Sequence, residues 1–294
     1  MNIAFNKIAL GIAFSPTAEA MLVETARLAK SLNAEILLIH VGTRTAEAEQ
    51  KLNAMIAKCD ILRERMELVW GSGDPVNVIL DSCKKHHVDL LVTGALKKEN
   101  LVQYYVGTIA RKVLRKARCS VFTIINPTIE NKPYKNVVAS AEDSSYIDEA
   151  ISTACRLMPK DNGSWVHIVR EVKLYGLTMA AADQHTEEEY DDVRQKLVKQ
   201  EIQKVEEIMQ HIPHEGIRVN IKTVSGKSGF ELPRFAQRKN ADLLVIGAPP
   251  GRFSFFDRVF PHDMEYILAD LPCSLLVVQP SKYTQLPGKE TGNG

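Results

Sequence analysis

Runs of apolar residues with almost no polar interruption recur along this chain. They include Leu90–Val92, Val121–Ile125 and Leu243–Ile246. A strand with one exposed face would alternate apolar and polar residues, so these continuous runs predict strands that are covered on both faces. Such strands are typical of a parallel sheet with helices on each side. The pattern therefore predicts an α/β fold.

Stretches of helical period separate these runs. Between Glu19 and Ser31, apolar side chains recur at three- and four-residue spacing, which predicts an amphipathic helix. A longer helix of the same kind is expected over about residues 186–211. Strands that alternate with helices in this way favour parallel strands joined by helical crossovers.

Several segments occur twice in the same order. VDLLVTGA at residues 88–95 matches ADLLVIGA at residues 241–248. EILLIHV resembles SWVHIV, an alignment that pairs His40 with His167. A repeat of this length indicates a duplicated domain rather than a short solenoid unit.

The repeat divides the chain into two domains, residues 1–127 and 128–281. Each is expected to form a five-stranded, mostly parallel sheet flanked by helices. The second copy is longer, and we assign the excess to a helical insertion at about residues 170–212. The polar segment at residues 282–294 is expected to be a disordered tail.

Composition narrows the class of protein. The 37 Lys and Arg residues nearly balance the 36 Asp and Glu residues, so no overall field attracts nucleic acid or an anionic membrane. No apolar run is long enough to span a membrane. The five cysteines include no C-x-x-C pair and fit reduced thiols. We therefore expect a cytoplasmic protein that binds neither nucleic acid nor membrane.

A glycine-containing stretch follows the fourth predicted strand of the first copy. In GALKKENLVQYYVGT, Gly94 precedes Lys97, and Gly107 and Thr108 stand directly before the helical pattern IARKVLRKA. Backbone N–H groups of a glycine loop in front of a helix N-terminus can bind phosphate. The structural alternative is a strand that ends at Gly94 and a helix that is capped by Thr108.

With these features the chain resembles a tandem universal stress protein over nearly its whole length. The resemblance implies a nucleotide-binding fold with G-x2-G-x9-G-[ST] after the fourth strand and an acidic residue after the first. Gly94, Gly107 and Thr108 fall on that spacing. Lys97 stands at the second glycine, and Ala13 stands at the acidic position.

The second copy departs further from the family pattern. Gly247 matches the first glycine, Pro250 replaces the second, and Phe260–Pro261 replaces the final pair. An acid does follow its first strand, either Glu142 or Asp143. Neither copy therefore carries the full set.

Three functions stay open on these residues. The first is a non-catalytic stress-response protein that acts through protein contacts or small-ligand binding and requires no cofactor. The second is a sensor of ATP or AMP, with Mg, that uses Gly94, Lys97, Gly107 and Thr108. The third is an adenylating or hydrolytic enzyme, for which the sequence offers no SGG-x-D-S-like loop and no acid–base pair. We expect no enzyme.

The resemblance also implies that the fifth strands, Val121–Ile125 and Leu275–Val278, pair between the two domains. One chain would then contain the dimer that single-domain relatives form. An exposed apolar edge would otherwise be open to other chains, which supports this pairing. A homodimer of the whole chain stays open, and its protein partners are unknown.

The helix after Gly107 carries a row of cations that includes Arg111 and Arg115, whereas the equivalent stretch of the second copy carries acids that include Glu265. One interpretation is a pair of solvated faces. The other is docking between oppositely charged faces of the two halves or of two chains.

The remaining motifs have structural interpretations. SGKSG at residues 225–229 lacks the leading glycine of a phosphate-binding P-loop. GSGDPV predicts a turn into a helix, with Asp74 as the N-cap and Pro75 in the first helical position. The histidine pairs have no nearby cysteine or acid cluster to complete a metal site, so no metal is expected.

Overall fold

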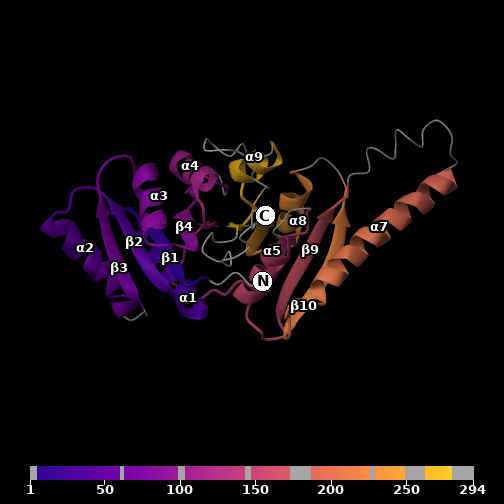
Figure 1. Cartoon of the computed structure of the whole chain (residues 1–294), viewed down its shortest axis with the longest axis horizontal. Coiled ribbons are helices and arrows are strands. Elements are labelled where there is room, and N and C mark those ends of the chain that lie inside the picture. Colours follow the sequence, from indigo (N-terminus) through magenta and orange to yellow (C-terminus); the bar gives the residue numbers. More distant parts are fainter. Residues whose placement is uncertain are drawn as a thin grey trace, which may run out of the picture.

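The computed structural model describes residues 5–59, 63–98, 103–142, 147–172, 187–225, 229–248 and 262–279. Figure 1 shows an elongated molecule in which two halves lie side by side. We call residues 5–127 half one and residues 128–279 half two. The expected tail at residues 282–294 lies outside the described residues.

Each half contains strands that alternate with helices. Half one comprises β1 (Lys7–Ile12), α1 (Ala18–Leu32), β2 (Glu35–Val41), α2 (Ala46–Ile56), a 3-10 turn (Arg63–Arg65), β3 (Met66–Gly71), α3 (Pro75–Lys85), β4 (Leu90–Gly94), β5 (Leu96–Lys97), β6 (Tyr104–Tyr105), α4 (Thr108–Lys116) and β7 (Ser120–Ile124). Half two comprises β8 (Asn136–Ser140), α5 (Ile147–Leu157), β9 (Ser164–Glu171), α7 (Glu187–Met209), β10 (Ile217–Val224), α8 (Glu231–Arg238), β11 (Leu243–Gly247), α9 (His262–Ala269) and β12 (Ser274–Val278).

One sheet of ten strands runs through the molecule in the order β10-β9-β8-β11-β12-β7-β4-β1-β2-β3. Within each half, neighbouring strands of this sheet are parallel. The α/β fold with parallel strands is therefore confirmed. The two expected five-stranded sheets are joined edge to edge into one.

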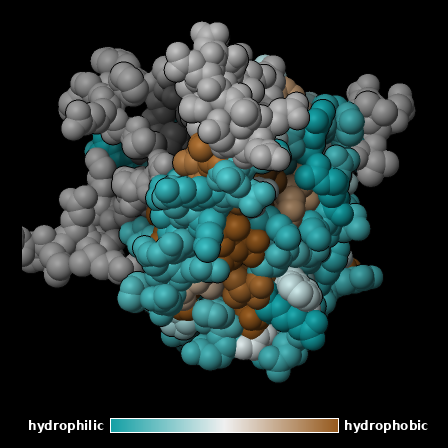
Figure 2. Space-filling model, turned by 90° about the vertical axis from the view of Figure 1, so that its right-hand side faces the viewer, coloured by the Kyte–Doolittle hydropathy of each residue, from teal (hydrophilic) through white to brown (hydrophobic). Residues whose placement is uncertain are grey.

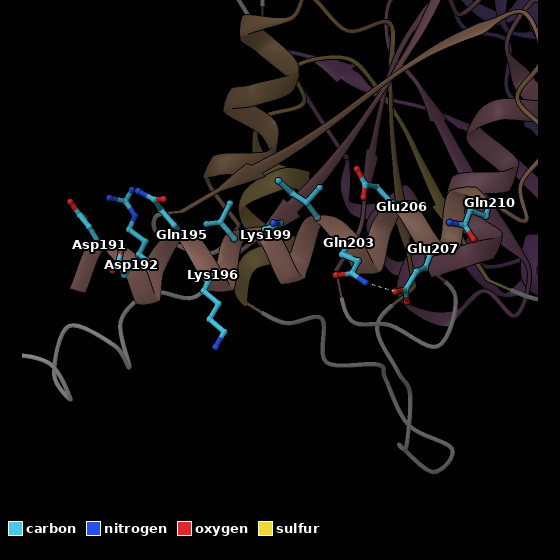
Figure 3. A pocket seen from close by; sticks show the side chains of 12 residues that line it. Asp191, Asp192, Gln195, Lys196, Lys199, Gln203, Glu206, Glu207 and Gln210 are labelled. Atoms are coloured by element: carbon cyan, nitrogen blue, oxygen red, sulfur yellow. Dashed lines mark hydrogen bonds between the residues drawn. The ribbon is translucent and has the colours of Figure 1, made fainter. Parts of the chain in front are cut away.

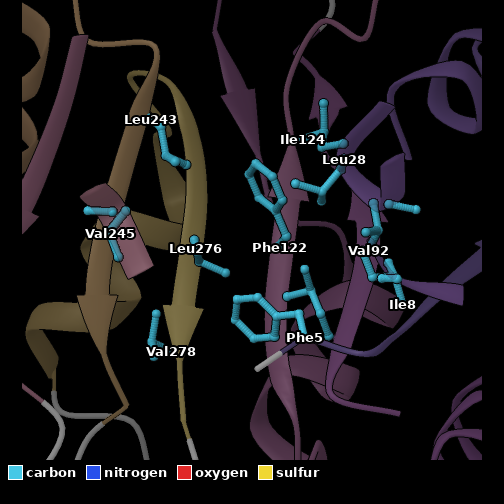
Figure 4. Packing of buried hydrophobic residues seen from close by; sticks show 14 of the residues in the cluster. Phe5, Ile8, Leu28, Val92, Phe122, Ile124, Leu243, Val245, Leu276 and Val278 are labelled. Carbon is cyan, nitrogen blue, oxygen red and sulfur yellow. The ribbon is translucent and has the colours of Figure 1, made fainter. Parts of the chain in front are cut away.

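The junction is an antiparallel pair between the two fifth strands, β7 and β12. Phe122 lies opposite Leu276 at its centre, and Figure 4 shows the apolar side chains that pack around this seam. Ser120 Oγ donates to the Gln279 carbonyl at 2.9 Å, which fastens one end of the seam. The pairing leaves neither fifth strand as an open sheet edge.

Helices cover both faces of the sheet, as the continuous apolar runs require. Two buried apolar clusters lie on the two sides. One contains residues of α1, α2, α5 and α7, and the other contains residues of α3, α4, α8 and α9. Each cluster extends across both halves, so the halves share their cores.

The duplication is exact enough to align the halves residue by residue. Asp89 Oδ2 accepts hydrogen bonds from the backbone at the start of β1, and Asp242 Oδ2 accepts the same bonds at the start of β8, all at 2.9–3.1 Å. The first residue of β1 lies opposite Glu35, and the first residue of β8 lies opposite Trp165. Glu35 and Trp165 therefore occupy equivalent positions.

This register corrects one sequence alignment. Counting along the strands from Glu35 and Trp165, His40 corresponds to Arg170 and not to His167. The sequence comparison matched two histidines within apolar runs that tolerate a three-residue shift. Only strand pairing distinguishes the two alignments.

The helical insertion expected at about residues 170–212 falls partly on α7 and partly on residues 173–186, which lie outside the described residues. α7 lies between the second and third strands of half two, which is the place of α2 in half one. It has 23 residues where α2 has 11. Val205 and Met209 are buried, whereas residues 191–196 are exposed on the part that projects from the body in Figure 1.

Local signals in the sequence place several helix ends correctly. Asp74 is the N-cap of α3, since its Oδ1 accepts from the Asn77 N–H at 3.0 Å, and Pro75 is the first helical residue. This prediction is confirmed.

The outer surface of half two is mostly hydrophilic, with a narrow apolar strip that Figure 2 shows between polar flanks.

Candidate functional site

The stretch expected to cradle phosphate forms a hairpin. Gly94 is the last residue of β4, and Lys97 lies in β5, which pairs antiparallel with β6. Gly107 is the N-cap of α4, and Thr108 is its first residue. The expectation that Thr108 caps this helix is therefore wrong. No side-chain hydrogen bond caps α4, and Thr108 is exposed.

The hairpin is docked on half two. Tyr104 forms an antiparallel bridge with Leu271, and the Leu271 N–H donates to the Tyr104 carbonyl at 2.9 Å. The Val106 N–H donates to the Leu268 carbonyl at 2.9 Å. Backbone groups beside Gly107 are thus engaged by the other half of the chain.

Close packing explains the glycine at position 107. A Cβ built there would lie 2.7 Å from Leu96 Cδ1, so Leu96 occupies the space in front of this residue. The φ of Gly107 is −66°, which any residue can adopt, so backbone freedom is not the reason for this glycine. At Gly94 a Cβ would meet Met21 Sδ at 3.6 Å, an ordinary contact.

A cavity of about 640 Å³ lies beside the hairpin. It is lined by Leu96, Lys97, Lys98, Tyr105, Arg111 and Ala269. Arg111 is paired with Glu265 at 2.5 Å, and the Lys98 ammonium donates to Gln103 Oε1 at 3.3 Å. Lys97 and Arg111 therefore line the same cavity, whereas Thr108 is not among its lining residues. Glu265 already compensates the positive charge of Arg111.

The charged helices dock the two halves together. Arg111 and Arg115 of α4 both pair with Glu265 of α9. For these two arginines, the interpretation of docking between oppositely charged faces of the two halves is therefore confirmed, and that of a solvated face is wrong.

The carboxyl ends of the first three strands of half one are filled by aromatic side chains. Phe14 and His40 have ring centroids 4.7 Å apart, as do His40 and Trp70. His40 Nδ1 lies 2.9 Å from the Ile12 carbonyl, and since a carbonyl only accepts, Nδ1 carries the proton. Ala13, at the expected acidic position, is exposed and offers no carboxylate.

Half two uses an ion pair at the same place. Arg170 Nη1 donates to the Ala141 carbonyl, the counterpart of the carbonyl that His40 contacts in half one. Arg170 Nε lies 2.7 Å from Glu201 Oε2, and both side chains are largely buried. The pair fastens α7 to β9. A charged residue at the end of an apolar strand is the only sign of this pair in the sequence, and it was not among the expected site residues.

Two of the remaining expected residues of half two lie within the described part of the chain. Gly247 ends β11, and Glu142 is exposed after β8. Asp143 and the replacements Pro250 and Phe260–Pro261 lie outside the described residues.

A larger hollow, of about 1210 Å³, runs along α7. Figure 3 shows mostly polar side chains of this one helix along it, among them Lys199 and the hydrogen-bonded Gln203 and Glu207. Binding sites for small molecules usually combine an apolar lining with polar groups that converge from several elements. The described lining does not have that character.

The described residues include neither a cluster of metal-ligating side chains nor, at Cys155 and Cys273, a reactive thiol. Within the described ranges, no three His, Cys, Asp or Glu side chains gather as metal ligands. Burial raises the pKa of Cys155 to about 11 and that of Cys273 to about 12, which keeps both thiols protonated and unreactive. No helix in the described part of the chain is long and apolar enough to cross a membrane.

Comparisons with known proteins agree with this architecture. The model of the universal stress protein family matches residues 4–124 and 133–279. Universal stress protein YxiE of Bacillus subtilis is 22% identical over 146 residues, which cover 41% of this chain and 99% of YxiE. Universal stress protein MJ0531 of Methanocaldococcus jannaschii is 29% identical over 75 residues, or 23% of this chain and 44% of that protein.

Solved structures of similar length share the fold of the whole chain. PA1789 of Pseudomonas aeruginosa PAO1, described as functionally unknown, superposes with a TM-score of 0.63 at 16% identity and covers 95% of this chain and 94% of its own. A universal stress protein of Archaeoglobus fulgidus superposes with a TM-score of 0.60 at 17% identity, with 94% and 98% covered. At these identities the likeness concerns the fold alone.

Proposed function

Because the chain belongs to the universal stress protein family, we propose that it is a stress-response protein that acts without catalysis, through contacts with other proteins rather than through a bound nucleotide. One observation carries the proposal. Leu96 occupies the space in front of Gly107, and the surrounding loop is folded as a hairpin against half two. A phosphate bound at the start of α4 would need that space.

The other end of the expected nucleotide site supports the same conclusion. Phe14, His40 and Trp70 pack against one another at the strand ends, and Ala13 supplies no carboxylate there. The residues present in half one therefore do not match a nucleotide cradle. The alternative, an ATP or AMP sensor with Mg, relies on the uncapped start of α4 at Gly107 and on Lys97 beside it.

Isothermal titration of the full chain with Mg-ATP, and separately with AMP, tests the proposal. We expect no saturable heat from either nucleotide. A variant that combines Leu96→Gly with Lys97→Gly opens the space and restores the second glycine of the family pattern, so any binding gained there would identify these side chains as the obstruction. Saturable binding by the unmodified chain, lost in a folded Gly107→Val variant, would overturn the proposal in favour of the sensor.

A further inference from the structure

A row of aromatic side chains crosses one face of half two, where β9 and β10 begin and α8 ends. Trp165 and His167 have parallel rings with centroids 5.9 Å apart, and His167 meets Phe235 edge-on, also at 5.9 Å. Trp165 is 39% exposed, although β9 has a neighbouring strand on each side. A large apolar side chain presented to solvent in this way is a feature of interaction surfaces.

Three cations surround the row. The Arg218 guanidinium lies 5.5 Å from the centre of the Trp165 ring. The Arg238 guanidinium and the Lys239 ammonium lie 5.8 and 5.9 Å from the centre of the Phe235 ring. All three are exposed. None of them forms an ion pair with another described residue. We call this set, with Trp165 and His167, the basic aromatic face.

The histidine of this face contributes a ring rather than a charge. The Asn220 amide lies 2.8 Å from His167 Nδ1 and donates to it, so that nitrogen carries no proton. Burial, together with the nearby charge of Lys239, lowers the pKa of His167, which keeps the ring neutral at physiological pH. The positive charge of the face therefore comes from Arg218, Arg238 and Lys239.

Half one provides an internal comparison, because acids stand there at the positions of Trp165 and Asn220. Glu35 stands where half two has Trp165, and Glu67 stands where it has Asn220. Lys7 pairs with Glu35 at 3.1 Å, and His86 lies 3.2 Å from Glu67. Cations stand at equivalent places in both halves, since Arg65 and Lys85 correspond to Arg218 and Arg238. The feature specific to half two is the exposed Trp165 among them.

We propose that the basic aromatic face binds an acidic polypeptide segment in which an apolar side chain stands among carboxylates. The carboxylates would pair with Arg218, Arg238 and Lys239, and the apolar side chain would pack on the exposed part of Trp165. Charge complementarity is the basis for this choice of partner. The proposal rests on the proposed function, since it names the surface through which protein contacts are made.

Nucleic acid fits the same face less well. Single-stranded nucleic acid requires a basic groove that follows several phosphates, together with aromatic rings free for stacking. Here there are three cations, one of which already covers the Trp165 ring, and the whole chain has a net charge of only +1. A short acidic peptide needs no more than these groups.

Fluorescence anisotropy of a labelled peptide, titrated with the full chain, tests the proposal. The probe is EEEYDD, the acidic run that this chain itself carries at residues 187–192, and the control peptide is QQQYNN. We expect saturable binding of EEEYDD only, weakened when NaCl is raised from about 50 to about 300 mM, because exposed charges are screened over that range. Arg238→Glu should weaken binding about tenfold, and Trp165→Ala by a similar factor.

Lys85→Glu is the matched control, because Lys85 is the exposed counterpart of Arg238 at the end of α3 in half one. It makes the same change in net charge at the equivalent place and should leave binding unchanged. Equal loss in Lys85→Glu and Arg238→Glu would overturn the proposal, as would binding of a deoxythymidine oligonucleotide without binding of EEEYDD, or the absence of peptide binding.

Sedimentation of the chain alone identifies the source of the acidic segment. A dimer that dissociates in Arg238→Glu but not in Lys85→Glu would support the proposal, with a second copy as the partner. Failure of peptide binding would leave the nucleotide titrations unaffected. Likewise, nucleotide binding in half one would overturn the proposed function without altering the peptide result.

Discussion

Half one and half two have the same strand order and the same register, yet they close the carboxyl edges of their strands with different chemistry. Half one packs Phe14, His40 and Trp70 together, whereas half two places the ion pair Arg170–Glu201 there. Both solutions satisfy the same backbone carbonyl position at the end of the first strand. Duplication has thus preserved the packed strands while the residues at their ends diverged.

The opposite edge shows the same contrast. In half one, Lys7 pairs with Glu35 and lies 3.9 Å from Glu67, whereas half two places Trp165 at the position of Glu35 with the Arg218 guanidinium over its ring. Strand interiors are constrained by close packing on both faces, where even small volume changes are costly. Strand ends are partly solvated and can change chemistry at little cost. Differences between the halves therefore occur mainly at such places.

The largest expected effect breaks the seam that both halves share. Phe122 is fully buried opposite Leu276, and its replacement by Ala should lower the free energy of unfolding by about 3–5 kcal/mol, because a cavity opens between two packed strands. Leu276→Ala, on the other side of the seam, should cost about 2–5 kcal/mol. Urea denaturation measures both. Losses below about 1 kcal/mol for the two variants would show that the seam is not a common core.

The second prediction compares the two strand-end solutions. Arg170→Ala should cost about 2–3 kcal/mol, because it removes the bonds of Arg170 to Glu201 and to the Ala141 carbonyl, while Lys204 still pairs with Glu201. His40→Ala, at the equivalent position, removes one neutral hydrogen bond and should cost about 1–2 kcal/mol. The double variant Arg170→Met with Glu201→Leu should recover most of the loss in the same denaturation measurement. A double variant as unstable as Arg170→Ala would mean that breaking the Arg170–Glu201 pair is not the cause of the lost stability.

The third prediction addresses the hairpin of half one. Gly107→Ala should cost about 1 kcal/mol, because the added Cβ would meet Leu96 Cδ1 at 2.7 Å, and this end of a half-exposed side chain can move aside. Combining it with Leu96→Ala should recover part of that cost, which a double-mutant cycle detects. Gly94→Ala is the matched control, since its Cβ meets Met21 at an ordinary distance. Equal costs at the two glycines would rule out the close contact as the cause.

The smallest expected effect concerns an acid of half one beside the segment that joins the halves. Burial raises the pKa of Glu24 to about 7, although Arg27 and Lys132 oppose the shift. The native state then binds a proton more tightly than the unfolded state, so this contribution to stability is full below about pH 4.5 and is lost as pH rises through about 7. After allowance for solvent screening, the change should be about 1 kcal/mol.

Thermal unfolding between pH 5 and 8 tests this effect. Glu24→Gln should remove the dependence on pH in that window, since its side chain does not titrate. Glu19→Gln on the same helix is the control, because Glu19 forms an exposed ion pair with Lys58 that contributes little. An unchanged pH profile in Glu24→Gln would show that another group is responsible.

The sequence by itself determined the repeat, the α/β class and several local ends. Continuous apolar runs such as Leu90–Val92 admit few structures other than strands covered on both faces. Asp74 followed by Pro75 can start a helix wherever the segment lies, because the cap is made within one turn. These features are local, so their physical causes are present in the sequence itself.

Only the tertiary structure decided which residues face one another. The equivalence of His40 with Arg170 follows from strand register, and register depends on partners far apart in the chain. The glycine stretch matched the spacing of a phosphate loop, yet Leu96 packs on Gly107 and the hairpin docks on half two. The spacing of glycines along a chain shows only where the backbone could approach a ligand closely. What fills the space beside it depends on side chains that the fold brings from elsewhere.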